Sequence, residues 1–265
     1  MNLADRLGIY RNRGLQEEEA AILVLLEETG IALFSAFPDH FVLFGGAALL
    51  LFHESPRFSR DLDLLVSLKP LPLIGEIETA VRREIQPVAE TLGLGQLDFQ
   101  KYNESADFVR YWVVANNKPL FSIDLTRIGG SVLESQIVKQ TIPGAKERTV
   151  LTATADYLLL QKCEVFLDRR RVKARDAFDI HLLVGRGASL SSNLKAHLED
   201  FILLKELDDE FIESRIQSIN VKLCTAELRS VLPPALFDEL ASREFKPIRD
   251  SLRTLFSEWV TEELK

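Results

Sequence analysis

Hydrophobic and polar positions follow two patterns along the chain, which change near residue 150. In the first part, short apolar runs and alternating segments stand between stretches of helical periodicity, and this predicts strands mixed with helices. Turn-forming residues separate them, and Asn116-Asn117-Lys118-Pro119 predicts a hairpin turn. The predicted elements are helices over Glu17–Phe34, Ala47–His53 and Leu73–Leu92, and strands over Phe41–Phe44, Arg60–Val66, Leu97–Tyr102, Phe108–Ala115, Leu120–Arg127 and Arg148–Leu151.

After Thr152 only helical periodicity remains. Thr154 is a candidate N-cap for a helix ending near Asp168, and a second helix is predicted from Lys173 to Leu183. The last predicted helix has the clearest apolar stripe, formed by Ile248, Leu252, Leu255, Phe256, Trp259, Val260 and Leu264. The sequence therefore predicts an α+β protein. A mixed sheet with helices occupies residues 1–150, and an all-helical domain in residues 151–265 completes a cleft.

Composition narrows the class of protein. A chain of 265 residues favours two adjoining domains or one domain with a large appendage, and its 46% hydrophobic and 27% charged residues are ordinary for a soluble protein. The net charge of −8 argues against broad coating of nucleic acid, but it permits a local basic cleft. Apolar runs are far below the roughly 20 residues that span a bilayer, and the two cysteines lack zinc-binding spacing. We expect a cytoplasmic protein with no membrane partner.

Asp61 and Asp63 are the first candidates for chemistry. Residues two apart on a strand share a face, with α-carbons about 7 Å apart, so their carboxylates can converge on a hard divalent cation. Phosphoryl transfer with two metal ions uses such a cage, and a third carboxylate on a neighbouring strand usually completes it. Asp124 is the candidate third ligand, because it stands on the polar face of a strand whose other face is apolar.

Gly45-Gly46 supplies a second part of this candidate site. The pair follows an apolar strand and precedes a short helix, where glycines permit close backbone approach and the helix start offers free N–H groups to phosphates. Each feature has an ordinary structural explanation, because an Asp-x-Asp can be the solvent-facing side of a strand and a Gly-Gly can be a turn. Their combination in this order indicates a metal- and nucleotide-binding site within Phe41–Val66.

Two motifs resemble a known family. Gly45-Gly46-Ala47-Ala48-Leu49 followed by Ser59-Arg60-Asp61-Leu62-Asp63 is similar to the motif of AbiEii/AbiGii-type nucleotidyltransferases, a toxin-like branch of the polymerase-β superfamily. A second block agrees with the family's downstream pattern: Lys162, then Arg169-Arg170-Arg171, then Arg175-Asp176-Ala177-Phe178-Asp179-Ile180. The resemblance extends from about Phe41 to Leu183 and implies a polymerase-β-like core.

The resemblance also implies an activity. The family transfers a nucleotide from an NTP to an acceptor hydroxyl with Mg²⁺ (or Mn²⁺). Some members modify the 3′ end of tRNA and block translation, and an antitoxin is commonly encoded beside them, as in a type IV-like toxin–antitoxin pair. Carried onto this chain, catalysis falls to the metal ligands Asp61, Asp63 and Asp124, together with Lys162. The predicted nucleotide-binding residues are Gly45, Gly46, Arg60, Lys162, Arg175, Asp176 and Asp179.

Alternatives remain open at this point. Many superfamily members place Ser or Thr after the glycines, whereas this chain has Ala47, which motivates a catalytically weakened NTP- or partner-binding module on the same fold. Transfer to a small molecule or a protein hydroxyl is a third option, which the acidic charge favours. The basic cluster between Arg169 and Arg175 has a structural alternative too, since its arginines can pair with Glu164, Asp168 and Asp176 at a solvated helix end.

Overall fold

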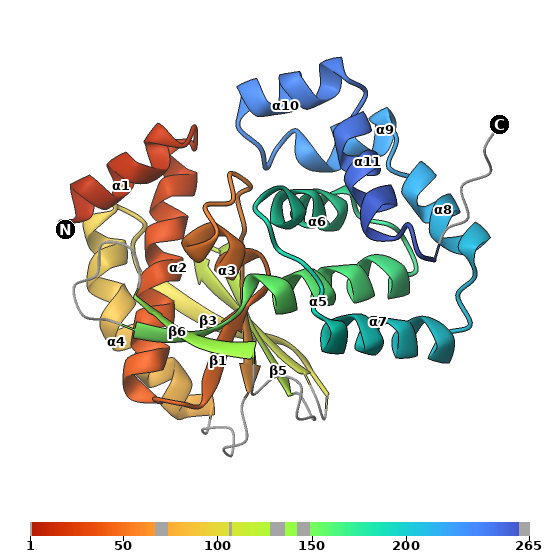
Figure 1. The fold of residues 1–265 in the computed structure, drawn as a ribbon. Coiled ribbons are helices and arrows are strands. Elements are labelled where there is room, and N and C mark those ends of the chain that lie inside the picture. The colour runs from red at the N-terminus through yellow and green to blue at the C-terminus, as the bar shows by residue number, and fades with distance from the viewer. Residues whose placement is uncertain (1, 67–73, 106–107, 128–135, 142–148, 260–265) are drawn as a thin grey trace. The chain divides into compact units, whose positions relative to one another are not determined.

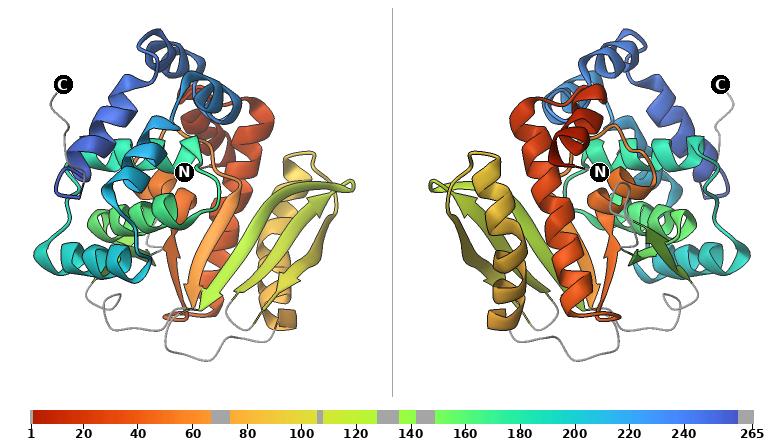
Figure 2. Two further views of the ribbon diagram at one scale, coloured as in Figure 1. Left: turned by 90° about the vertical axis from the view of Figure 1, so that its right-hand side faces the viewer. Right: turned by 90° about the vertical axis from the view of Figure 1, so that its left-hand side faces the viewer.

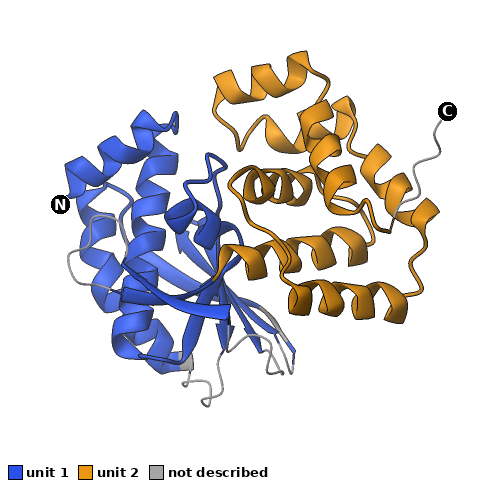
Figure 3. Cartoon of the chain, in the orientation of Figure 1, with its two compact units in different colours: residues 1–153 blue, residues 154–265 orange. Residues whose placement is uncertain are grey.

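The structure, a computed structural model, describes residues 2–66, 74–105, 108–127, 136–141 and 149–259 (Figure 1). The chain divides into two compact units, Met1–Ala153 (unit 1) and Thr154–Lys265 (unit 2) (Figure 3). Unit 1 holds the sheet, and unit 2 is helical throughout its described part. Together they confirm an α+β fold with a helical C-terminal part. None of the helices in these described ranges is long and apolar enough to cross a membrane.

Unit 1 is built on a seven-stranded mixed sheet in the order β3-β4-β5-β2-β1-β7-β6. The central strand β2 lies between two strands. It pairs antiparallel with β1, which precedes it in the sequence, and parallel with β5, which comes much later in the chain. The strands are β1 (Phe41–Phe44), β2 (Asp61–Val66), β3 (Leu97–Glu104), β4 (Phe108–Ala115), β5 (Lys118–Arg127), β6 (Ile137–Thr141) and β7 (Thr149–Ala153).

The two faces of the sheet differ in polarity at its centre. Leu62 and Leu64 of β2 and Ile123 of β5 are buried, while Asp61 and Asp63 point to the opposite face because side chains alternate along a strand. The helices α2 (Glu17–Ala36) and α4 (Ile74–Thr91) lie side by side over the apolar face (Figure 2). The carboxylates are thereby kept out of the apolar core.

An N-terminal helix, α1 (Leu3–Asn12), packs against α2 and is held to it by buried polar contacts. Arg6 donates to Glu27 at 2.6 Å and also pairs with Glu28, and the hydroxyl of Tyr10 donates to Glu27. Burial raises the pKa of Glu27, and the Arg6 charge opposes that rise. A carboxylate only 4% exposed is therefore retained by two donors from a neighbouring helix.

Unit 2 is a helical domain in which α5 and α6 pack on each other, α5 also packs on α7, and α6 also packs on α9 and α11. Thr154 caps α5 by accepting a hydrogen bond from the backbone N–H of Tyr157, as the sequence predicts. Phe166 of α5 stacks on Phe256 with ring centroids 6.2 Å apart. The helices are α5 (Ala155–Asp168), α6 (Ala174–Gly185), α7 (Ser192–Leu204), α8 (Asp209–Gln217), α9 (Val221–Leu228), α10 (Pro234–Ser242) and α11 (Lys246–Leu255).

The predicted elements between Glu17 and Leu183 are present, and the structure differs from the prediction in four places. Helix α3 (Gly45–Phe52) includes the glycine pair, which the sequence placed before the helix. Strand β6 and helix α1 were not predicted, since α1 has a weak apolar stripe and begins with a capping box between Asn2 and Asp5. The last helix ends at Leu255, with buried Phe256 as its C-cap residue; Val260 and Leu264 lie outside the described residues.

We expect Arg6→Ala to lower the free energy of unfolding by about 2 kcal/mol at neutral pH, because it leaves the Glu27 carboxylate buried without its cation. The loss should shrink on acidification, since a carboxyl whose pKa is raised in the folded state takes up a proton there first. Urea unfolding of wild type and Arg6→Ala, measured from neutral to acidic pH, tests both effects. Adding Glu27→Gln to Arg6→Ala is the control and should recover part of the loss; an equal loss at every pH would contradict this explanation.

Candidate active site

Three carboxylates meet at the centre of the sheet. In the parallel pairing of β2 with β5, Asp61 lies opposite Ser122 and Asp63 lies opposite Asp124. Residues opposite each other on paired strands point to the same face, so Asp61, Asp63 and Asp124 share the polar side of the sheet. The hydroxyl of Ser122 donates to one oxygen of Asp61 at 3.0 Å. The sequence thus identified three residues that the fold brings together, although they come from strands about 60 residues apart in the sequence.

Arg110 is the residue that sequence reasoning missed. It lies opposite Asp124 in the antiparallel pairing of β4 with β5, and its Nε and Nη2 donate to the two oxygens of Asp124, the Nε at 2.8 Å. The hydrogen bond with Asp124 raises the pKa of Arg110, burial opposes it, and the charges of Asp61 and Asp63 add to the rise. A polar position in an otherwise apolar-alternating strand was the available signal, but its partner depended on strand register.

These residues fit a divalent cation in part. Asp61 and Asp63 are each partly exposed, and carboxylate oxygens are the ligands that Mg²⁺ and Mn²⁺ prefer. Asp124 is only 4% exposed, and Arg110 occupies both of its oxygens. Within the described ranges there is no group of three acidic, histidine or cysteine side chains arranged to hold a metal ion. Asp61 and Asp63 therefore stay candidate ligands for a cation, and Asp124 is engaged by an arginine.

Gly45 lies against Asp63. A Cβ built on Gly45 would come within 2.1 Å of a carboxylate oxygen of Asp63, and the Gly45 φ of +66° is in the left-handed region that favours glycine. Helix α3 starts here, and its N-cap residue, Phe44, provides no side-chain hydrogen bond. Since the first N–H groups of a helix have no partners within it, the glycine pair places backbone N–H groups beside the Asp63 carboxylate.

The loop of residues 53–60 closes over the second glycine. A Cβ on Gly46 would lie 2.5 Å from the Oγ of Ser59 and 2.8 Å from Nη2 of Arg57. Both side chains are only 5% exposed. Arg60, a predicted nucleotide-binding residue, is exposed next to them, with its guanidinium 5.3 Å from the centre of the Phe58 ring. The sequence included Ser59 in a motif but gave no reason to select Arg57.

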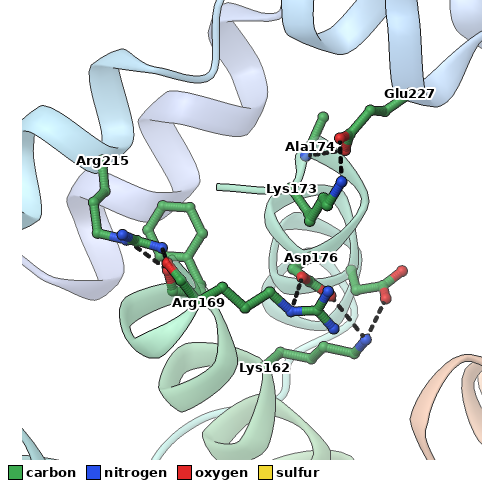
Figure 4. A network of polar contacts seen from close by, with 9 residues as sticks. Lys162, Arg169, Lys173, Ala174, Asp176, Arg215 and Glu227 are labelled. Carbon is green, nitrogen blue, oxygen red and sulfur yellow. Dashed lines mark hydrogen bonds and ion pairs between the residues drawn. The ribbon is translucent and has the colours of Figure 1, made fainter. Parts of the chain in front are cut away.

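The second motif forms an ion-pair network inside unit 2 (Figure 4). The Nζ of Lys162 on α5 lies 2.8 Å from Asp179 and 3.4 Å from Asp176, both on α6. Arg169 pairs with Asp176 at 3.1 Å. Lys162 is 14% exposed, whereas both aspartates are almost fully buried. The i and i+3 spacing of the aspartates on one helix face, visible in the sequence, therefore serves to hold one lysine.

Only some residues of the basic cluster between Arg169 and Arg175 form ion pairs with acidic side chains. Arg169 pairs with Asp176, as the structural alternative predicts, but Asp168 pairs with Lys205 and Glu164 with His197. Arg175 is partly exposed and makes no side-chain hydrogen bond or ion pair with the residues that the structure describes. Lys162, Arg175, Asp176 and Asp179 all belong to unit 2, so their predicted approach to a nucleotide stays a prediction.

Two further side chains organise this network. Buried Arg215 of α8 donates to the carbonyls of Phe166 and Arg169 at 2.7 and 2.8 Å, where α5 ends. Glu227 of α9 accepts from the backbone N–H of Ala174 at 2.8 Å and from Lys173 at 3.1 Å, at the start of α6 (Figure 4). A carboxylate at a helix start and a guanidinium at a helix end both complement the helix dipole. They fix the two helices that hold Lys162 and its aspartates.

Comparisons with known proteins give a family and a fold. The family model described as "Nucleotidyl transferase AbiEii toxin, Type IV TA system" matches residues 30–263. The crystal structure of JHP933 from Helicobacter pylori aligns over 92% of this chain and 96% of its own, with 18% identity and a TM-score of 0.54. A second crystal structure from H. pylori, described as that of a nucleotidyltransferase, aligns over 95% of this chain and 99% of its own, with 19% identity and a TM-score of 0.54.

At that level of identity, each of these two structures shows a similarity to this chain in fold alone. A third, the nucleotidyltransferase toxin MenT4 from Mycobacterium tuberculosis H37Rv, aligns over 71% of this chain and 66% of its own with 16% identity, and its TM-score of 0.42 is too low to bear on the fold. No curated protein matches the chain at a significant level.

We expect Gly45→Ala to lower the free energy of unfolding by at least about 1–2 kcal/mol, because a side chain there takes a left-handed backbone and meets the Asp63 carboxylate. Urea unfolding measures the change. Gly30→Ala is the matched control, since a Cβ at Gly30 meets nothing within 4 Å and alanine favours the interior of α2. The control should match or exceed the wild-type stability; equal stability of Gly45→Ala and wild type would refute the close approach.

Proposed function

The chain belongs to the AbiEii nucleotidyl transferase toxin family, and from this premise we propose that it transfers a nucleotide from an NTP to the 3′ hydroxyl of tRNA in the cytoplasm. The proposed metal is Mg²⁺ or Mn²⁺. The single observation that carries the proposal is the placement of Asp61 and Asp63 beside the glycine-rich start of α3. This arrangement offers anionic ligands for a cation and backbone donors for phosphates within one side-chain length of each other.

The reaction we propose is an in-line displacement at the α-phosphorus. The acceptor oxygen forms a bond to that phosphorus, the bond to the bridging oxygen breaks, and pyrophosphate leaves with its electron pair. Asp61 and Asp63 would hold the cation, which would lower the pKa of the acceptor hydroxyl and neutralise charge on the phosphates. The N–H groups of Gly45 and Gly46 orient the triphosphate, and the acceptor's proton passes to a carboxylate of the site or to water. Positioning and electrostatics supply the acceleration.

The helical unit has a part in this proposal. A lysine held by two buried aspartates has a fixed direction, so Lys162 is suited to contact a phosphate group. Asp176 and Asp179 then act as positioning residues for Lys162, and exposed Arg60 and half-buried Arg175 are further contacts for the nucleotide. A nucleotide added to the 3′ end of tRNA would block aminoacylation and translation, so we further propose a cognate antitoxin as the partner that limits this activity.

Two observations favour a second candidate, an NTP- or partner-binding module without turnover. Ala47 lacks the hydroxyl found at this position in many superfamily members, and Arg110 engages both oxygens of Asp124. A site with one carboxylate neutralised and one hydroxyl missing can bind a triphosphate yet stabilise its transfer poorly. Binding without release of pyrophosphate distinguishes this module from the enzyme.

With each labelled NTP, Mg²⁺ and total tRNA, we expect label on the tRNA 3′ end, and Asp61→Asn to reduce the rate at least about 100-fold, because one anionic ligand is lost. Gel analysis of labelled tRNA and an assay of released pyrophosphate measure this. Asp98→Asn is the matched control, since Asp98 is 67% exposed on β3. Pyrophosphate release with label on protein or on a small molecule would show that the acceptor is not tRNA. NTP binding without release of pyrophosphate would favour the binding module without turnover.

Arg110 permits a separate test of Asp124. If Asp124 is the third metal ligand, Arg110→Met should lower the Mg²⁺ concentration that gives half-maximal binding of NTP a few-fold, because a competing cation is removed. Asp124→Asn should raise that Mg²⁺ concentration. Titration of Mg²⁺ at a fixed NTP concentration measures the effect of each substitution. Should the two substitutions alter turnover alike and leave the Mg²⁺ dependence unchanged, Asp124 is an anchor for Arg110 and not a metal ligand.

A further inference from the structure

One row of residues crosses four strands of the sheet and begins at a carboxylate of the candidate site. In the register of the strands, Asp61 of β2 lies opposite Ser122 of β5, and Ser122 lies opposite Trp112 of β4. Trp112 in turn lies opposite Gln100 of β3. Opposite residues point to the same face, so the whole row belongs to the polar face of the sheet. Because neighbouring strands are about 4.8 Å apart, Trp112 lies roughly 10 Å from Asp61 across the sheet.

The ring of Trp112 is accessible on this face. Along β4, Val109, Tyr111 and Val113 are buried, whereas Arg110 and Trp112, which alternate with them, are partly exposed. Within the described part of the chain, no group hydrogen-bonds to the Trp112 indole, and no aromatic or cationic side chain stacks on it. An indole has a large flat surface that gains free energy by stacking on another ring. Trp112 therefore offers a stacking surface beside the carboxylates.

Gln100 adds hydrogen-bonding groups next to this ring. It is exposed on β3, and its amide makes no hydrogen bond with the residues that the structure describes. A glutamine amide carries two donor hydrogens and an acceptor oxygen. A stacking ring together with an amide is the combination that recognises an unpaired nucleobase, since the ring covers the face of the base and the amide contacts its edge.

The place of Trp112 in the sheet decides which base it can meet. In the proposed reaction the triphosphate lies at Gly45 and Gly46, which follow β1, and β1 and β5 lie on opposite sides of β2. An in-line displacement puts the attacking oxygen on the side of the phosphorus away from the leaving pyrophosphate. The acceptor therefore approaches over β5 and β4, on the side of the carboxylates where Trp112 lies.

We propose that Trp112 stacks on the terminal nucleobase of the acceptor and that Gln100 hydrogen-bonds to the edge of that base. The inference deepens the proposed function and rests on it. It makes the acceptor a single-stranded nucleic acid with a free 3′ hydroxyl, because only unpaired bases expose a face to an aromatic side chain. A base held at Trp112 orients its own sugar, and this brings the 3′ hydroxyl toward Asp61 and Asp63.

A purely structural role for Trp112 predicts a different result. If the ring only covered buried Ser122, leucine and phenylalanine would both replace it as apolar covers and would behave alike. If the ring stacks on a base, Trp112→Phe should keep most of the affinity for RNA, and Trp112→Leu should lose it. Phe99→Leu is the matched control. Phe99 is partly exposed on β3 and lies opposite Val113, so it belongs to the other face of the same strand pair.

The decisive experiment measures binding of a short single-stranded RNA with a 3′ hydroxyl to the full chain, by fluorescence anisotropy of a 5′ label. The matched ligand is the same RNA whose terminal nucleotide lacks its base. Wild type should bind the intact RNA at least about fivefold more tightly than the abasic RNA, because stacking of one base is lost. Trp112→Leu should bind both RNAs equally, while Trp112→Phe and Phe99→Leu should keep the preference. Gln100→Ala should reduce discrimination among the four terminal bases.

The fluorescence of Trp112 gives a second readout that leaves Trp112 unchanged. The chain has two tryptophans, so Trp259→Phe makes Trp112 the single emitter. Because a stacked base lies directly on the indole, the intact RNA should quench this emission at saturation, and the abasic RNA should quench it much less. Equal quenching by the two RNAs would contradict contact with the terminal base.

The outcomes separate this inference from the proposed function. If wild type binds intact and abasic RNA equally well but transfers label to tRNA, the inference is overturned and nucleotidyl transfer stands. If Trp112→Leu weakens binding of Mg²⁺–NTP in calorimetry and not binding of RNA, the ring serves the incoming nucleotide, which also overturns the inference. If wild type binds no RNA and releases no pyrophosphate from any NTP, both are overturned. Should Trp112→Leu unfold at a much lower urea concentration than wild type, the comparison of the two RNAs on wild type decides.

Discussion

The close approach of Gly45 to Asp63 is the constraint on which the rest of the site depends. The Asp63 carboxylate occupies the space where any side chain at position 45 would begin, and the backbone there has a left-handed conformation. Helix α3 can therefore start immediately after β1 and still lie against β2. This brings the free N–H groups of a helix next to a strand that carries two carboxylates, which is the local arrangement that nucleotide chemistry needs.

Charge balance explains the groups that surround this contact. Three carboxylates on one face of a sheet repel each other, and the fold provides Arg110 from β4 against Asp124 and the Ser122 hydroxyl against Asp61. The same principle operates in unit 2, where Lys162 and Arg169 neutralise Asp176 and Asp179. In the described part of the chain, each buried acidic group has a positive partner, whereas Asp61 and Asp63, the metal ligands of the proposed function, are partly exposed.

Membership of the AbiEii family and the fold of unit 1 give the same general conclusion by different routes. The family supplies a nucleotidyltransferase toxin, and the sheet brings three carboxylates to one face, one of them against the start of α3.

The sequence by itself determined most elements and the carboxylate site, because strand alternation puts Asp61 and Asp63 on one face and the apolar face of β5 marks Asp124. It missed α1, whose weak apolar stripe is compensated by ion pairs with α2, and it extended α11 past Leu255. Only tertiary structure decided that Arg110 pairs with Asp124 and that Ser59 faces Gly46. Both depend on strand register and loop closure, which bring together residues that local periodicity cannot relate.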